Sequence, residues 1–384
     1  MCLTVIRLLV SLGRLVGSLL PCRNPSGLFF FFPFYHTGGA EKVHSDIVTC
    51  FGEERPWVFF AKRSKDTTLL ERFRAQARCF DIPWLLKYGY PFSAGVLAGM
   101  ISRHPSPKVF GCNSLFYYLL LPHLPKQVQT VDLLHALGGG AERFALPVLE
   151  RLDWRVVIST AVRNELLAFY RIEGVERALD SRITVIANRV EVPATMPEKP
   201  SCGPLQVLFV GRGSEEKRAC LIAQAARSCR ERGLDIEFTL VGDLDGWLHE
   251  EDRPSCTLTG LISSESALTE LYRQSHLILI SSSREGFPLT LMEGMAQGCV
   301  PVCTAVGGIP EHIRHMENGW LLPTKDDDAV VTALCSALKQ LSQDRSLLER
   351  LSVAAFDYAL RHFGGGRFCE EYRNILKSNQ GSFS

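Results

Sequence analysis

The stretch LILISSSREGFPLTLMEGMAQGCVPVCTAVGGIPEH, residues 277–312, decides the fold. It opens with an apolar run, residues 277–280, which is short enough to be a buried parallel strand. A helix is expected over LTLMEGMAQ, because Pro288 suits its first position and Gly298 suits the residue after its end. A second strand at residues 300–303 and a second helix follow. This alternation predicts an α/β fold with parallel sheets.

Two carboxylates, Glu285 and Glu293, belong to the loop and the helix that follow the first strand. In open α/β sheets, ligands bind at the carboxyl ends of the strands. The amides at the helix start, after Gly286, stabilise an anion such as a phosphate, and carboxylates accept hydrogen bonds from sugar hydroxyls. The arrangement suits a sugar joined to a nucleotide by a diphosphate. The alternative is an ordinary strand–turn–helix unit in which Glu293 is solvated.

The sequence EGFP at residues 285–288, followed by Glu293, resembles the E-x7-E motif of the family 4 retaining glycosyltransferases. The resemblance spans residues 28–375. It implies the α/β GT-B fold, which is two Rossmann-like domains facing a central cleft. It also implies that Glu285 binds sugar hydroxyls and Glu293 the ribose. The donor contacts that it implies in this stretch come from Glu285, Gly286, Phe287, Pro288, Leu289 and Glu293.

Two cations follow an earlier strand, residues 207–210. Arg212 and Lys217 lie five positions apart across a glycine-containing turn, and both can converge on a diphosphate, Arg through its fork and Lys as a point charge. In the family, an Arg and a Lys at this spacing neutralise the leaving nucleoside diphosphate. The alternative is a pair of solvated charges at a helix start. Arg218 stands where the family usually has glycine, and Leu261 stands in the loop on which the family places the nucleotide base.

A glycine pair follows the first strand, residues 28–32. Gly38 and Gly39 lead into a helix expected at residues 42–48, and such a loop lets the backbone approach a phosphate or a sugar hydroxyl. The segment GGAE resembles the family's glycine loop, which lies beside the donor diphosphate and the acceptor. A glycine pair alone is also common in ordinary turns.

His135 resembles the family's histidine at a strand end, which lies near the transferred sugar and the acceptor. The strand is expected at residues 128–131, so Asp132 stands between the strand and the histidine, whereas the family usually has the histidine directly after the strand. A structural histidine with satisfied hydrogen bonds is the alternative interpretation.

The chain has 384 residues, of which 46% are hydrophobic and 22% charged, which is ordinary for a soluble protein and sufficient for two domains. The net charge is +1, but residues 1–200 carry 24 Lys and Arg against 17 Asp and Glu, while residues 201–384 carry 18 against 24. The basic first half indicates an anionic partner, either a membrane surface or an acidic acceptor, unless it is ordinary scatter of surface charge. A nucleic-acid partner is not expected.

The 13 cysteines form no CxxC pair and do not cluster with histidines along the chain. Several stand in apolar runs, where free cysteine behaves as a small hydrophobe. We therefore expect a reducing compartment, the cytoplasm, with neither a disulfide framework nor a zinc site.

Residues 1–22 are apolar but contain Arg7 and Arg14. An arginine near the middle of a spanning helix is costly, and a secretory signal carries its charge before the apolar segment. An amphipathic helix fits better, either docked on its own domain or lying on a membrane surface. A signal peptide is the third alternative.

Four prolines between residues 193 and 204 indicate a linker. The expected division is a terminal helix or linker at residues 1–26, an acceptor-side domain at 27–195, a nucleotide-sugar domain at 205–362 and, at 363–384, a last helix that in GT-B proteins crosses back to the first domain.

The resemblance implies metal-independent transfer of a hexose-type sugar, with retention, from a UDP-, GDP- or ADP-sugar to a glycan, a lipid-linked acceptor or a protein. No cofactor is expected. Charge grows on the departing diphosphate, and preorganised cations stabilise it. The candidate catalytic residues are His135, Arg212, Lys217 and Glu285. The alternatives are a GT-B-like sugar-nucleotide epimerase and a non-catalytic subunit that keeps the fold.

Overall fold

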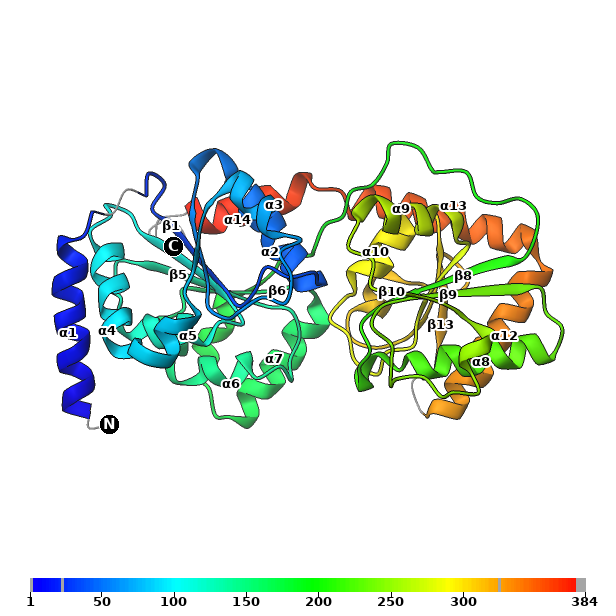
Figure 1. Ribbon diagram of the computed structural model, residues 1–384, viewed down its shortest axis with the longest axis horizontal. Helices are drawn as coiled ribbons and strands as arrows, with labels where there is room; N and C mark the ends of the chain where they lie inside the picture. The colour runs from blue at the N-terminus through cyan, green and yellow to red at the C-terminus, as the bar shows by residue number, and fades with distance from the viewer. Residues whose placement is uncertain (1–2, 22–23, 324–325, 378–384) are drawn as a thin grey trace. The chain divides into compact units, whose positions relative to one another are not determined.

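Two parallel β-sheets, each in its own compact unit, make up the computed structural model, which describes residues 3–21, 24–323 and 326–377 (Figure 1). The first unit comprises the chain up to Ala187 together with the last helix, from Arg367, and the second comprises Asn188–Gly366. The first unit thus ends before residue 195, where the sequence places the boundary. Residues 1–2, 22–23 and 378–384 of the predicted terminal segments lie outside the described residues.

The sheet of the first unit has seven strands in the order β3-β2-β1-β4-β5-β6-β7. Its interior strand β1, LFFFF, is buried along its whole length, as expected of a parallel strand covered on both faces. Figure 1 shows α2, α3 and α14 on one side of this sheet and α5, α6 and α7 on the other. The strands are β1 (Leu28–Phe32), β2 (Trp57–Phe60), β3 (Arg78–Asp81), β4 (Lys108–Cys112), β5 (Gln129–Leu134), β6 (Trp154–Val157) and β7 (Ile183–Val185).

The edge strand β3 was not among the strands expected from the sequence. One expectation for this unit was wrong, because β5 continues to Leu134 instead of ending at residue 131. Asp132 therefore lies inside the strand, where an ion pair with Arg155 allows a carboxylate to be buried. The helices of the first unit are α1 (Leu3–Leu19), α2 (Gly39–Thr49), α3 (Leu70–Gln76), α4 (Pro83–Ser102), α5 (Leu115–Leu120), α6 (Ala141–Ala145), α7 (Thr160–Ile172) and α14 (Gly366–Lys377).

The sheet of the second unit has six parallel strands in the order β10-β9-β8-β11-β12-β13. The predicted strand at residues 277–280 is its buried strand β11. The strands are β8 (Leu205–Val210), β9 (Ile236–Val241), β10 (Thr257–Gly260), β11 (Leu277–Ile280), β12 (Val300–Thr304) and β13 (Trp320–Leu322). The helices are α8 (Ala219–Glu231), α9 (Glu265–Gln274), α10 (Leu289–Ala296), α11 (Ile309–His312), α12 (Asp327–Gln343) and α13 (Arg345–His362).

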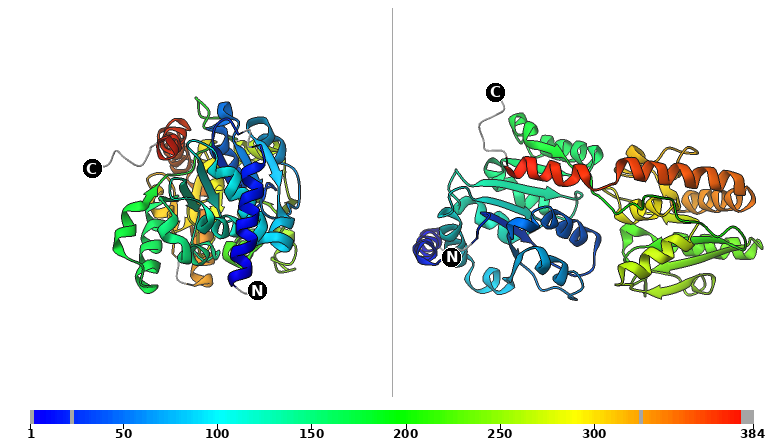
Figure 2. Two further views of the ribbon diagram at one scale, coloured as in Figure 1. Left: turned by 90° about the vertical axis from the view of Figure 1, so that its left-hand side faces the viewer. Right: turned by 90° about the horizontal axis from the view of Figure 1, so that it is seen from above.

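The last helix, α14, packs on the sheet of the first unit, and Figure 2 shows it from two further sides. A disulfide joins Cys50, just after α2, to Cys369 in α14. Arg373 donates to the Cys50 carbonyl oxygen at 2.9 Å, and Tyr372 is fully buried. The expectation that no disulfide forms was therefore wrong for this pair, because a separation of 319 residues leaves no local sequence signal.

Candidate functional site

Both sheets reverse their strand order at one point, and the predicted site residues follow the strands at these points. In the second unit the order reverses between β8 and β11, and Lys217 follows β8 while Glu285 follows β11. In the first unit it reverses between β1 and β4, and Gly38 follows β1. Such switch points leave a crevice at the carboxyl ends of the strands, where ligands of α/β proteins bind.

Lys217 and Glu285 form an ion pair in the second unit. The Lys217 Nζ donates to Glu285 Oε1 at 2.6 Å, and the Ser282 hydroxyl donates to the same oxygen at 2.6 Å. The two charged side chains are only 22% and 10% exposed, so their interaction is screened less by solvent than that of a surface pair. The structure thus brings one predicted cation and one predicted acid together, and it adds a serine that the sequence analysis missed.

Hydrogen bonds between the two loops fix this pair. The Ser281 hydroxyl donates to the Lys217 carbonyl oxygen at 2.9 Å, and the Ser283 amide donates to the Glu216 carbonyl oxygen at 2.8 Å. Lys217 ends a short 3-10 turn, Glu215–Lys217, and the helix α8 begins after it, at Ala219. The serines after β11 therefore hold the backbone of this turn against their own loop.

The loop after β12 closes on the other side of Glu285. Gly307 has a φ of +54°, and a Cβ on it would overlap the Glu285 carbonyl oxygen. The Gly308 amide donates to the Gly286 carbonyl oxygen at 2.7 Å. The glycine pair that follows β12 thus allows close backbone packing, which explains why glycine is required at position 307.

The residues after Gly286 build the start of α10. Pro288 is the residue before the helix and not its first residue as predicted, while Gly298, with a φ of +78°, follows its end as predicted. Phe287 stacks on His312 with ring centroids 4.2 Å apart, and the side chains of Phe287 and Leu289 are buried. A ligand at this helix start would therefore meet the backbone of these residues.

Arg212 and Glu293 are engaged with partners other than Lys217 and Glu285. Arg212 is 74% exposed and pairs with Glu216 at 2.7 Å. Burial acts to raise the pKa of Glu216, but the Arg212 guanidinium lowers it below its ordinary value. The Tyr272 hydroxyl donates to Glu293 Oε2 at 3.1 Å. Leu261 is 69% exposed. Of the four charged residues predicted to bind the donor, only Lys217 and Glu285 thus contact each other directly in the structure.

Arg218 shows why this turn usually contains glycine. Its φ is +47°, in the left-handed region that disfavours side chains. Its guanidinium donates to the carbonyl oxygens of Ser281 at 2.7 Å and Ser282 at 3.2 Å, and it pairs with Asp327 at 2.7 Å. Arg218 therefore ties the β11 loop to the turn that carries Lys217, which offsets the strain of its backbone.

We expect Arg218→Ala to destabilise the protein by about 1–3 kcal/mol, since it leaves part-buried carbonyl oxygens without their charged donor and keeps the strained backbone. Arg218→Gly should lose less, because glycine removes the strain. Urea unfolding of the two variants measures the difference. Equal losses in both variants would show that the φ of +47° carries no cost.

In the first unit the glycine loop begins α2. Gly38 immediately precedes the helix with extended backbone, and α2 begins at Gly39, three residues earlier than predicted. A Cβ on Gly38 would meet the Glu41 carboxylate, the mobile end of a flexible side chain, and the backbone here is extended, so neither close backbone packing nor a left-handed φ requires this glycine. The carboxylate of Glu41, the fourth residue of GGAE, thus lies beside Gly38, the first.

His135 follows β5 directly, so the longer strand removes the apparent departure from the family pattern. Its Nε2 lies 3.2 Å from Nε2 of His44, on α2, whose ring stacks on Phe32 with centroids 4.3 Å apart. His44 is a residue that the sequence analysis missed. The contact requires one ring nitrogen to donate and the other to accept, which neutral imidazoles can do.

Both imidazoles are neutral near pH 7. Burial lowers the pKa of His135 to about 4, and burial together with the neighbouring His135 lowers the pKa of His44 well below its ordinary value. His135 can therefore donate or accept a hydrogen bond, but it supplies no positive charge to a diphosphate at neutral pH.

These low pKa values predict that the protein loses stability in acid. The unfolded chain, with histidine pKa values near 6.5, binds more protons than the folded chain between about pH 6.5 and pH 4. The free energy of unfolding should thus be highest above pH 6.5. It should decrease as the pH falls from 6.5 to 4, by about 3 kcal/mol for His135 alone. Urea unfolding of His135→Asn should show a shallower fall. The exposed His249→Asn serves as control, and parallel curves for all three proteins would contradict the prediction.

His44, Cys112 and His135 are brought together at the carboxyl ends of β4 and β5, although the sequence shows no such cluster. Their ligand atoms lie within 4.8 Å of one another, and among the described residues they are the group that could hold a metal ion. Burial, followed by the nearby Asp132, raises the pKa of the Cys112 thiol well above its ordinary value. Without a bound metal ion the thiol is therefore protonated and the cluster is neutral, with a hydrogen bond between its two histidines.

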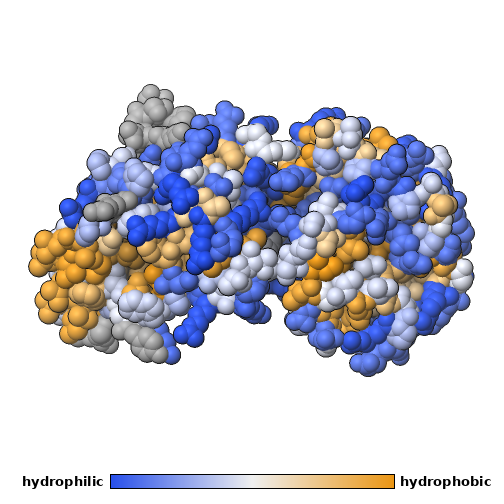
Figure 3. Space-filling view, turned by 45° about the horizontal axis from the view of Figure 1, so that its top comes forward, coloured by the Kyte–Doolittle hydropathy of each residue, from blue (hydrophilic) through white to orange (hydrophobic). Residues whose placement is uncertain are grey.

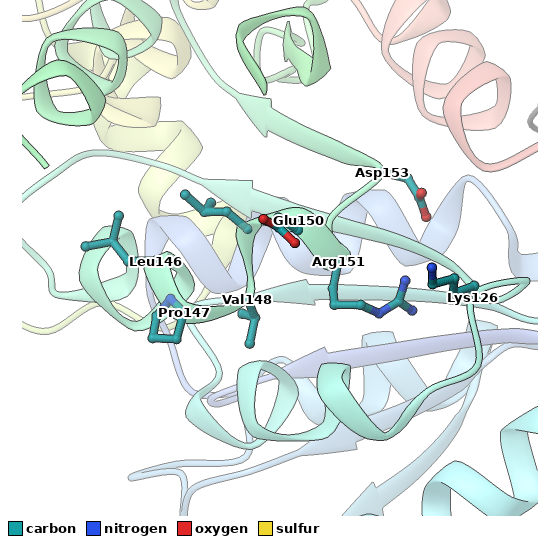
Figure 4. Close-up of a pocket in the computed structure, with 8 residues that line it drawn as sticks. Lys126, Leu146, Pro147, Val148, Glu150, Arg151 and Asp153 are labelled. Carbon is teal, nitrogen blue, oxygen red and sulfur yellow. The ribbon is translucent and has the colours of Figure 1, made fainter. Parts of the chain in front are cut away.

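A pocket of about 430 Å³ also lies in the first unit, and Figure 4 shows Arg151 and Lys126 at its wall. None of the predicted site residues lines it. The Arg151 guanidinium donates to the carbonyl oxygens of Leu121 and Pro125, at 3.5 and 3.3 Å. This cation therefore has a structural role in joining two loops.

Residues 204–340 match the family model of the glycosyl transferases group 1. The amylovoran biosynthesis glycosyltransferase AmsK of Erwinia amylovora is 30% identical over 164 residues, which are 40% of this chain and 39% of AmsK. The N-acetyl-alpha-D-glucosaminyl L-malate synthase of Bacillus anthracis is 31% identical over 139 residues, 36% of this chain and 34% of the synthase. The matches thus span less than two fifths of these relatives.

The structure of Alr3699/HepE from Anabaena in complex with UDP superimposes with a TM-score of 0.71 at 17% identity, covering 91% of this chain and 99% of that chain. This likeness concerns the fold, and it confirms the predicted α/β GT-B class with Rossmann-like sheets. The family match confirms the resemblance to glycosyltransferases in the part of the chain where the motifs were strongest.

Proposed function

We propose that this chain, a GT-B protein whose residues 204–340 are of the glycosyl transferases group 1, transfers a hexose-type sugar from a nucleoside diphosphate to an acceptor. The observation that carries the proposal is the 2.6 Å contact between Lys217 and Glu285 where the strand order reverses. A cation and an acid fixed at a ligand-binding crevice suit a substrate that combines a diphosphate with sugar hydroxyls.

In this proposal Lys217 binds the diphosphate and stabilises the charge that develops as the glycosidic bond breaks. Its ammonium is held in place by Glu285 and by the serine loop before the donor arrives, so little reorganisation is needed. Arg212 has an exposed side chain, which can turn from Glu216 toward the phosphates. The amides at the start of α10 add a positive partial charge. Neutralisation by these groups requires no metal ion, and metal independence is part of the proposal.

The carboxylates would orient the donor. Glu285 would accept hydrogen bonds from the sugar hydroxyls once the diphosphate competes for Lys217. Glu293 would bind the ribose, and its contact with Tyr272 fixes one carboxylate oxygen. Burial, followed by Glu293 itself, raises the pKa of Tyr272 well above its ordinary value, so this hydroxyl remains a donor. Gly38, Gly39 and Leu261 remain proposed contacts of the diphosphate and the base.

On the acceptor side, His135 would hydrogen-bond to an acceptor or sugar hydroxyl as a neutral imidazole. The leaving phosphate oxygen takes the acceptor's proton while the new glycosidic bond forms on the face that the diphosphate leaves. The anomeric configuration is then retained without a protein base. The acceptor class that we propose is a glycan or a lipid-linked glycan, as in surface polysaccharide synthesis, and AmsK is named for the biosynthesis of such a polymer.

Binding of nucleotide sugars tests this proposal. HepE was solved with UDP and with UDP-glucose, so UDP-sugars are tried first, followed by GDP- and ADP-sugars. A donor at 100 times its Kd should raise stability by about 2.7 kcal/mol, which thermal unfolding detects. Glu285→Gln should weaken the response to the sugar nucleotide more than the response to the free nucleotide. A chain that responds to no donor would be a non-catalytic subunit.

The product distinguishes the remaining alternative. A transferase with donor and acceptor should give a glycoside with the donor's anomeric configuration, which proton NMR coupling constants report. An epimerase would convert the sugar nucleotide alone, without an acceptor, into its epimer. Formation of that epimer would contradict the proposed sugar transfer and identify the protein as an epimerase.

A further inference from the structure

The outer face of α1 is an apolar stripe in contact with solvent. Its leucines follow helical spacing, and Leu8, Leu12, Leu15 and Leu19 are 68%, 51%, 60% and 76% exposed. Figure 3 shows apolar side chains gathered over this end of the first unit. Single exposed leucines are ordinary, but a continuous stripe of this kind marks an interaction surface.

The opposite face of α1 is fixed to α4 by glycines on both helices. A Cβ on Gly13 or Gly17 would overlap the carbonyl oxygens of Phe92 and Val96, and a Cβ on Gly95 or Gly99 would overlap those of Val10 and Arg14. In each helix the glycines stand four residues apart, the small-xxx-small pattern that lets helix backbones approach closely. Because this contact holds one face of α1 against the unit, the leucine stripe must point outward.

The charges of the two helices are all positive. Arg7 and Arg14 are the charged residues of α1 and both are exposed, Lys87 is the charged residue of α4, and neither helix contains a carboxylate. A second copy of the chain bound to this face through its own α1 would bring positive charges of the two copies close together, which is unfavourable. Arg14 donates to the His123 carbonyl oxygen of its own unit, which leaves Arg7 as the cation of α1 for a partner. A layer of anionic lipid headgroups above an acyl region matches both Arg7 and the leucines.

We propose that the leucine stripe of α1 docks on a membrane surface that contains anionic lipid. No helix in the described parts of the chain is long and apolar enough to cross a bilayer. In the proposal, α1 lies along the interface with Leu8, Leu12, Leu15 and Leu19 inserted. Because the glycine contact fixes α1 to α4, docking of α1 also attaches the β-sheet of the first unit to the membrane. The proposal does not depend on the transfer chemistry.

Flotation of the full chain with lipid vesicles tests the proposal. The chain should float with phosphatidylcholine vesicles that contain phosphatidylglycerol, and less with phosphatidylcholine alone. Leu8→Gln/Leu12→Gln/Leu15→Gln should weaken partitioning at least about tenfold, because binding scales with the apolar area inserted. Arg7→Gln should lower binding to anionic vesicles and its sensitivity to salt, with little change on neutral vesicles.

A matched control removes three exposed apolar side chains elsewhere. Ile172→Gln/Val353→Gln/Leu360→Gln changes residues that are 82%, 43% and 44% exposed on α7 and α13, and it should float like the unmodified chain. Equal flotation of both triple variants would overturn the proposal, as would absence of binding to anionic vesicles. A dimer in light scattering that the α1 variant converts to a monomer, without vesicle binding, would assign the stripe to a second copy.

Measuring donor binding in solution distinguishes a failure of the membrane proposal from a failure of the proposed function. The α1 variant should respond to nucleotide sugar in thermal unfolding as the unmodified chain does, which also shows that it is folded. Flotation that is lost while the donor response persists supports the docking surface. Flotation that persists in a chain that binds no donor contradicts only the proposed function.

Discussion

Lys217→Ala is expected to lower kcat/KM for sugar transfer by a factor of about 100 to 1,000, the range found when one preorganised group at a developing charge is removed. The lysine Nζ is placed by Glu285 at 2.6 Å and its backbone by the Ser281 hydroxyl at 2.9 Å. Alanine leaves the diphosphate without this charge at the moment when the glycosidic bond breaks. Steady-state kinetics with the donor identified by thermal unfolding measure the loss.

Two further variants give this measurement its controls. Lys217→Arg keeps the charge in a different geometry and should recover only part of the rate, because a planar guanidinium does not reproduce the point charge of an ammonium. Lys339→Ala removes an exposed lysine from α12 of the same unit and should leave the rate unchanged. An unaffected rate in Lys217→Ala, in a folded protein, would remove this residue from the mechanism.

Arg155→Met is expected to destabilise the protein by about 3–5 kcal/mol, the cost of breaking a buried ion pair by removal of one partner. Arg155 and Asp132 are 2% and 0% exposed and lie 3.2 Å apart on neighbouring strands of the first sheet. Arg155 also donates to the Tyr170 hydroxyl at 2.8 Å, and Tyr118 donates to Asp132 at 3.1 Å. Methionine would leave the carboxylate buried with only the tyrosine as a partner.

Urea unfolding followed by circular dichroism measures the loss. Asp132→Leu/Arg155→Met removes both charges and should recover most of the stability, because replacing a buried pair by apolar residues is close to neutral. Exposed Arg177→Met, in the 3-10 helix Arg177–Arg182 of the same unit, is the control and should change stability by less than about 0.5 kcal/mol. A double variant as unstable as Arg155→Met would show that the tyrosine contacts, and not the uncompensated charge, dominate.

Much of the fold was predictable because its signals are local. An apolar run such as residues 277–280 specifies a buried strand through its own composition, and Gly298 ends α10 because only glycine adopts its left-handed φ without strain. The alternation of such runs predicted parallel sheets, and the family match and the HepE structure confirmed the class. Local signals were weaker at β3 and at the end of β5. A buried aspartate there resembles a loop residue until its partner, 23 positions away, is known.

The candidate site was predictable to the extent that topology places residues. Lys217 and Glu285 follow strands that become neighbours at the strand-order reversal, so their types and positions sufficed to select them. The sequence could not show that Arg212 pairs with Glu216 in the structure, that Ser282 shares Glu285, or that Arg218 joins two loops. Side-chain contacts of this kind depend on rotamers and on neighbouring loops.

The sequence by itself determined most of the strands, the alternation of strands and helices, the glycosyltransferase motifs and the apolar character of residues 1–22, because each rests on residues near one another in the chain. Only the tertiary structure decided that Cys50 meets Cys369, that His44 faces His135, and that the leucines of α1 point outward while its glycines point inward. The reason is physical: such contacts join segments of high sequence separation, and packing of the whole chain is what brings them together.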